Sequence, residues 1–69
     1  MDERSRNRAS ELMAEITALL EDAHEQATAG QAEGLSLEEL YRLVGQVESA
    51  AEAVKSRADE VAKLCARRD

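Results

Sequence analysis

The sequence predicts an all-α fold, an antiparallel hairpin of two helices that residues 1–69 form as a single domain. Apolar residues recur every three or four positions along two long segments, as is typical of amphipathic helices. Proline is absent, and the three glycines all lie between Gly30 and Gly45. The short stretch 30–35 that joins the segments is expected to place the two helices side by side in opposite directions.

The first helix is expected over about residues 6–29. Its apolar stripe consists of Ala9, Leu12, Ile16, Leu19 and Ala23. A second row beside this stripe consists of Met13, Leu20 and Ala27. Gly30 follows at the position where a glycine commonly ends a helix, so we expect the first helix to end there.

The second helix is expected over about residues 37–67, with Ser36 as its N-cap. Ser36 and Glu39 have the spacing of a capping box, and Leu35 and Leu40 have that of a hydrophobic staple. A heptad pattern predicts the residues that contact the first helix, namely Leu37, Leu40, Val44, Val47, Ala51, Val54, Ala58, Val61 and Cys65. Beside them lies a further apolar row of Leu43, Ala50 and Leu64.

The second apolar row on each helix predicts a homodimer, because a lone hairpin needs only one row on each helix. A chain of this length also has too small a core for a stable monomer. We therefore expect two copies to form a four-helix bundle or a coiled-coil-like assembly. The predicted core and dimer residues are Leu12, Met13, Ile16, Leu19, Leu20, Leu43, Val47, Val54, Val61 and Leu64.

The composition argues against several classes of function. One His, one Cys and one Tyr cannot supply a zinc site, an internal disulfide or a catalytic triad, so we predict no enzyme, no metal and no cofactor. The formal net charge of −6 argues against direct binding of nucleic acid. No segment is apolar enough to span a membrane, and no signal peptide opens the chain, so we expect a soluble cytoplasmic protein.

The charges are unevenly distributed along the chain. Residues 9–54 contain ten acidic side chains and one basic one, Arg42, whereas the two ends carry a small excess of Lys and Arg. Such an acidic surface either keeps the protein in solution or attracts a basic partner. Tyr41 lies off the predicted contact row, where it either lies along the rim of the hairpin or anchors a partner. The predicted partner-binding residues are Tyr41, Arg42, Gly45, Glu38, Glu48 and Glu52.

The cap at Ser36–Glu39 and the heptads over 37–65 are the most recognisable features of the chain. With these features, and in its length, its acidity and its predicted helical dimer, the whole chain resembles small phage-encoded anti-activators of bacterial quorum sensing. The resemblance implies an inhibitor in the host bacterial cytoplasm that binds the DNA-binding domain of a LuxR-type regulator. It also implies a second target, a type IV pilus ATPase.

The alternatives are a hairpin co-chaperone or assembly factor of the secretion-system type, and a small subunit of a larger complex. A co-chaperone would use the apolar strip of Val61, Leu64 and Cys65, which lies opposite polar residues of the first helix.

Overall fold

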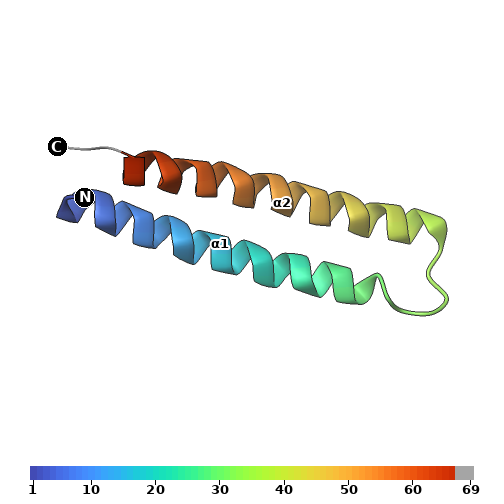
Figure 1. Ribbon diagram of the computed structural model, residues 1–69. Coiled ribbons are helices and arrows are strands. Elements are labelled where there is room, and N and C mark those ends of the chain that lie inside the picture. The colour runs from blue at the N-terminus through green and yellow to red at the C-terminus, as the bar shows by residue number, and fades with distance from the viewer. Residues whose placement is uncertain (67–69) are drawn as a thin grey trace.

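The computed structural model describes residues 1–66, which form two helices, α1 (Glu3–Ala29) and α2 (Leu37–Ala66). The helices pack side by side in opposite directions, so that the start of α1 and the end of α2 lie at the same end of the molecule (Figure 1). We call this the open end, and the end that carries residues 30–36 the loop end. The hairpin is a narrow rod of 55 × 14 × 11 Å. The predicted two-helix architecture is thus confirmed, while residue 67, where α2 was expected to end, lies outside the described residues.

The first helix begins three residues earlier than predicted, because Asp2 is its N-cap. The Asp2 carboxylate accepts a hydrogen bond of 2.7 Å from the backbone N–H of Ser5, and Glu3 adds a negative charge in the first turn. The apolar periodicity gave no indication of this start, because residues 3–8 contain no apolar side chain. The extra turn extends α1 along the end of α2.

The first helix ends at Ala29 with Gly30 as its C-cap, but Gly30 does not adopt the left-handed conformation that is common at this position. Its φ is −69°, in the right-handed region, and its N–H donates to the carbonyl of Gln26 at 3.0 Å, which continues the helical hydrogen bonding. Among residues 1–66, the left-handed conformation occurs at Gly34, whose φ is 81°. The chain therefore changes direction just before the cap of α2.

The N-cap of α2 is Ser36. Its hydroxyl oxygen accepts a hydrogen bond of 3.1 Å from the backbone N–H of Glu39, and its carbonyl accepts one of 3.0 Å from Leu40. The first of these is the serine half of the predicted capping box. Ser36 therefore fixes the residue at which α2 begins.

We expect Ser36→Ala to lower the free energy of unfolding by about 1 kcal/mol, because the Glu39 N–H loses its acceptor. Urea denaturation followed by circular dichroism measures this loss. Ser56→Ala is the matched control, since Ser56 lies exposed in the middle of α2, where alanine is a better helix former. An equal loss of stability in both variants would show that Ser36 does not act as a cap.

The core is a single row of contacts between the helices, and the buried apolar side chains of residues 1–66 are Leu12, Ile16, Leu43 and Leu64. Leu19 of α1 is half-buried in the same row, as are the predicted core residues Val47, Val54 and Val61 of α2. In α1 the contact row follows the predicted stripe. Met13 and Leu20, which were also predicted as core or dimer residues, are 52% and 54% exposed.

In α2 the contact row differs from the predicted one and is shifted by one residue at several positions. The residues that face α1 are Leu43, Val47, Ala50, Val54, Arg57, Val61 and Leu64, all of them buried or half-buried. The remaining residues of the predicted row, Leu37, Leu40, Val44, Ala51, Ala58 and Cys65, are exposed. At the four shifted positions the observed row holds Leu43, Ala50, Arg57 and Leu64 in place of Val44, Ala51, Ala58 and Cys65, so that two leucines are buried instead of a valine and a cysteine.

Candidate protein-interaction site

The outer edge of α2 faces away from α1 and carries most of the predicted partner-binding residues. Glu38, Tyr41, Gly45, Glu48 and Glu52 follow one another at three- and four-residue spacing, which aligns them in one stripe along the helix. All five are exposed, and the Tyr41 side chain is 82% exposed. We call these five residues the acidic edge.

Gly45 leaves a gap in the acidic edge. Apart from neighbouring residues and backbone of α2 itself, no atom lies within 4 Å of where a Cβ atom would be, so this position opens to free space. Arg42 is also exposed, but it follows Tyr41 directly and is rotated about 100° around the helix, away from the stripe. The structure therefore groups five of the six predicted residues and separates Arg42 from them.

Ion pairs join the two helices near the open end. The Arg57 Nε donates to a carboxylate oxygen of Glu15 at 2.7 Å, and the Arg8 Nε donates to Glu60 at 3.1 Å. Arg8 also lies 3.4 Å from Glu11 and 4.0 Å from Glu15. We call these five residues the polar face. Neither arginine was predicted to bind a carboxylate, although the antiparallel pairing places residue 8 close to residue 60.

The pKa of Arg8 is raised by its surroundings on the polar face. Its hydrogen bond to Glu60 is the main cause, and the negative charges of Glu60, Glu15 and Glu11 add to it. Both arginines of the polar face, Arg8 and Arg57, are therefore paired with carboxylates of the other helix.

We expect Glu15→Gln to lower the free energy of unfolding by less than about 1 kcal/mol, because Arg57 and Glu15 are both partly exposed to solvent. The difference from wild type should shrink in 0.5 M NaCl, since salt screens exposed charges. Urea denaturation at two salt concentrations measures both effects. Glu48→Gln on the acidic edge is the control, and a loss of several kcal/mol in Glu15→Gln would contradict the expectation.

A third surface is apolar. Several large side chains on it are partly exposed, namely Met13 at 52%, Leu20 at 54%, Leu40 at 39% and Val44 at 46%. Small exposed residues continue both rows. We define the apolar face as Met13, Leu20 and Ala27 of α1 together with Leu37, Leu40, Val44, Ala51, Ala58 and Cys65 of α2.

Helix geometry places the two rows of the apolar face on the same side of the hairpin. Met13 and Leu20 directly follow the contact residues Leu12 and Leu19, just as Val44 follows Leu43. Each residue of an α-helix is rotated by about 100° from the residue before it, and the sense of this rotation is the same in both helices when each is viewed along its own chain direction. Because α1 and α2 run in opposite directions and face each other, these two turns bring both rows out on one side.

The strip of Val61, Leu64 and Cys65 is not the exposed ridge that was expected. Leu64 is only 7% exposed and Val61 is half-buried, while Cys65 is exposed. Leu64 lies one turn beyond Glu60, which binds Arg8, and is therefore level with the first turn of α1. The early start of α1 at Glu3 accounts for the burial of Leu64.

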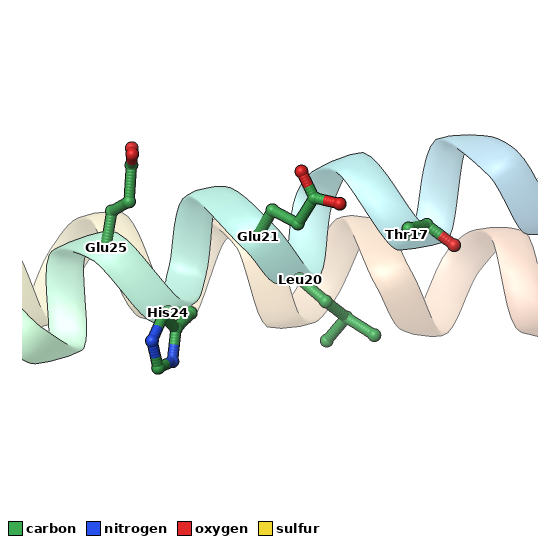
Figure 2. A pocket seen from close by; sticks show the side chains of 5 residues that line it. All are labelled: Thr17, Leu20, Glu21, His24 and Glu25. Carbon is green, nitrogen blue, oxygen red and sulfur yellow. The ribbon is translucent and has the colours of Figure 1, made fainter.

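A shallow depression of about 450 Å³ lies on α1 and is lined by Thr17, Leu20, Glu21, His24 and Glu25. Figure 2 shows Leu20 and His24 on one side of the helix and Glu21 and Glu25 pointing away from them. His24 lies one turn after Leu20, so it borders the apolar face. Since one helix supplies all five residues, nothing encloses a ligand there.

Among residues 1–66, no three His, Cys, Asp or Glu side chains are grouped so that they could hold a metal ion. Neither helix in this part of the chain is both long and apolar enough to cross a membrane. Comparison of the chain with models of protein families, with curated proteins and with solved structures finds no match.

Proposed function

We propose that this protein is a non-enzymatic inhibitor that binds a basic domain of another protein through the acidic edge of α2. The observation that carries this proposal is Tyr41, whose large side chain is 82% exposed on a regular helix. Tyrosine is among the residue types most often found at the centre of binding sites. Three glutamates accompany it on the same stripe, and the gap at Gly45 leaves room for a side chain of the target.

The charge distribution supports a basic target. Besides the acidic edge, Glu21, Asp22 and Glu25 lie near the end of α1, and the last turn of this helix contains no basic residue. These three carboxylates add to the attraction of a positively charged surface.

The kind of target that we propose is the DNA-binding domain of a LuxR-type quorum-sensing regulator, with a type IV pilus ATPase as a second target. A domain that binds DNA presents a basic surface, which an acidic helix can cover. Covering that surface would keep the regulator off its promoter. In this proposal the inhibitor acts as a homodimer in the cytoplasm of the host bacterium.

Calorimetric titration of a purified LuxR-type DNA-binding domain tests the proposal. We expect Tyr41→Ala to weaken binding about 30-fold or more, because loss of a central interface aromatic costs at least about 2 kcal/mol. Gln46→Ala is the matched control, since Gln46 is exposed on α2 but lies outside the acidic edge. Wild-type affinity in Tyr41→Ala, with the fold verified by circular dichroism, would reject the acidic edge as the binding site.

The exposed apolar face favours a second candidate, a structural co-chaperone or assembly factor that holds an apolar segment of another subunit. Salt separates the two functions. Binding through the acidic edge should weaken steeply as NaCl is raised from about 50 to about 500 mM, whereas binding through an apolar surface should change little.

A further inference from the structure

We propose that a second copy of this chain covers the apolar face, with the loop ends of the two hairpins at opposite ends of the dimer. This specifies the homodimer named in the proposed function and does not depend on the identity of the target. Four observations carry it: the exposed area, the lack of charge on the apolar face, the charges at the two ends of the rod and the order of large and small residues along α2.

The exposed area of the single chain is too large for a compact protein of its mass. A compact monomer of 7.6 kDa exposes about 4,300 Å². The hairpin exposes 5527 Å², about 1,200 Å² more. A stable interface typically buries about 800 Å² on each partner, so the excess suffices for one. With only four buried side chains, the hairpin also needs further burial to be stable.

A second copy suits the apolar face better than a basic target does. The nine residues of the face carry no charge, and the cation at its border, Lys55, is paired with Asp59 at 3.3 Å. A Lys or Arg of a target would therefore be buried against the face without a partner. A second copy offers an identical uncharged surface of the same length. Two-fold symmetry then buries both apolar faces in one contact.

The charges at the ends of the rod determine how the second copy is oriented. Glu21, Asp22 and Glu25 lie toward the loop end, together with Glu38 and Glu39. At the described part of the open end the charges balance, because four basic residues are matched by four acidic ones, namely Arg4, Arg6, Arg8 and Lys63 against Asp2, Glu3, Asp59 and Glu60. With both loop ends together, the acidic groups would repel one another. With the loop ends apart, each acidic end lies beside a nearly neutral end of the other copy, and this repulsion is avoided.

The order of residue sizes along α2 supports the same orientation. Leu37, Val44, Ala51, Ala58 and Cys65 recur every seven residues, with the two larger side chains, Leu37 and Val44, toward the loop end. When two copies of α2 lie antiparallel across the face with Ala51 at the centre, Leu37 meets Cys65 of the second copy. Val44 likewise meets Ala58 of the second copy. On either side of the centre a larger side chain then packs against a smaller one, and alanine at the centre allows close approach.

The first experiment measures the oligomeric state by sedimentation equilibrium at micromolar concentration. We expect wild type to have twice the monomer mass of 7.6 kDa. Val44→Lys should raise the dimer dissociation constant about 100-fold or more, because it buries an unpaired charge at the interface. Tyr41→Lys, three residues earlier but on the acidic edge, should leave the dimer intact. A folded monomeric wild type, or a Val44→Lys dimer of unchanged affinity, would overturn the proposal.

The second experiment tests the orientation and needs no destabilised variant. In a Cys65→Ala background, Ala51→Cys places a thiol next to its copy at the two-fold axis, so a short bismaleimide should link the two chains. Glu52→Cys, on the acidic edge, should not be linked. Wild-type Cys65 should also remain unlinked, because the two thiols lie at opposite ends. Linking of the wild-type chains through Cys65, with no linking of the Ala51→Cys variant, would place both loop ends together and overturn the orientation.

Neither experiment involves the target domain. If the titration of Tyr41→Ala rejects the acidic edge as a binding site, the mass and cross-linking results are unaffected. If sedimentation instead shows a folded monomer, the titration can still be interpreted, because the acidic edge lies on α2 of a single chain. The two proposals can therefore fail separately.

Discussion

Leu12→Ala is expected to leave the protein largely unfolded at 37 °C. Leu12 is the most completely buried side chain of the hairpin, with 1% of its surface exposed. Removing a buried leucine side chain beyond its Cβ costs about 2–5 kcal/mol, because it loses apolar burial and leaves a cavity. A chain of this length has a total stability of only about 3–10 kcal/mol. Thermal denaturation followed by circular dichroism measures the change.

Leu12→Met is the matched control for this prediction. Methionine has nearly the volume of leucine and a similar helix propensity, so the core stays filled and the loss should be below about 1.5 kcal/mol. Equal melting temperatures for Leu12→Ala and Leu12→Met would show that Leu12 does not support the contact between the helices.

Leu64→Ala is expected to produce the second large effect, a loss of about 2–5 kcal/mol in the free energy of unfolding. Leu64 is 7% exposed, because the first turn of α1 lies beside it. Cys65→Ala is the matched control. It changes the next residue, which is exposed in the hairpin, and removes a single sulfur atom. Urea denaturation of both variants should therefore give clearly different midpoints.

The same variant distinguishes the proposed inhibitor from the co-chaperone that would bind through Val61, Leu64 and Cys65. If Leu64 supports the fold, Leu64→Ala lowers stability and weakens target binding only as far as the protein unfolds. Unchanged stability together with lost binding would instead make this strip the binding site and favour the co-chaperone.

The two helices were predictable because their signals are local. The spacing of the apolar residues predicts both helices. Ser36 predicts the start of α2, because its hydroxyl has only to accept a hydrogen bond from the N–H of Glu39, three residues away. The cap at Asp2 is equally local, but no apolar residue follows it in the first turn of α1 to mark a helix. It was missed because apolar periodicity alone set the predicted start.

The contact row of α2 was not predictable from periodicity alone. Two apolar rows run side by side along this helix, so pairs such as Leu43 and Val44 both fit a contact position. Arg57 occupies a contact position that the apolar pattern assigned to its neighbour Ala58. A long arginine can lie at such a position because its stem packs while its guanidinium reaches a carboxylate, here that of Glu15.

Of the candidate site, the stripe of Tyr41, Gly45 and the glutamates followed from helical spacing, because spacing alone determines which residues share one side of a helix. The apolar face could not be derived in the same way. It depends on which row of α2 faces α1, and this is decided by the packing of both helices together.

The small core has a consequence for the amount of protein that a cell must hold. A chain with four buried side chains spends part of its time open when it is dilute, and proteases cleave open chains. A higher concentration favours the dimer that we propose, and the dimer lowers the fraction of open chains. Degradation by proteases therefore slows as the concentration of the protein rises. The lifetime of the protein would then depend on its own abundance, and the inhibition that we propose would begin only above a threshold rate of synthesis.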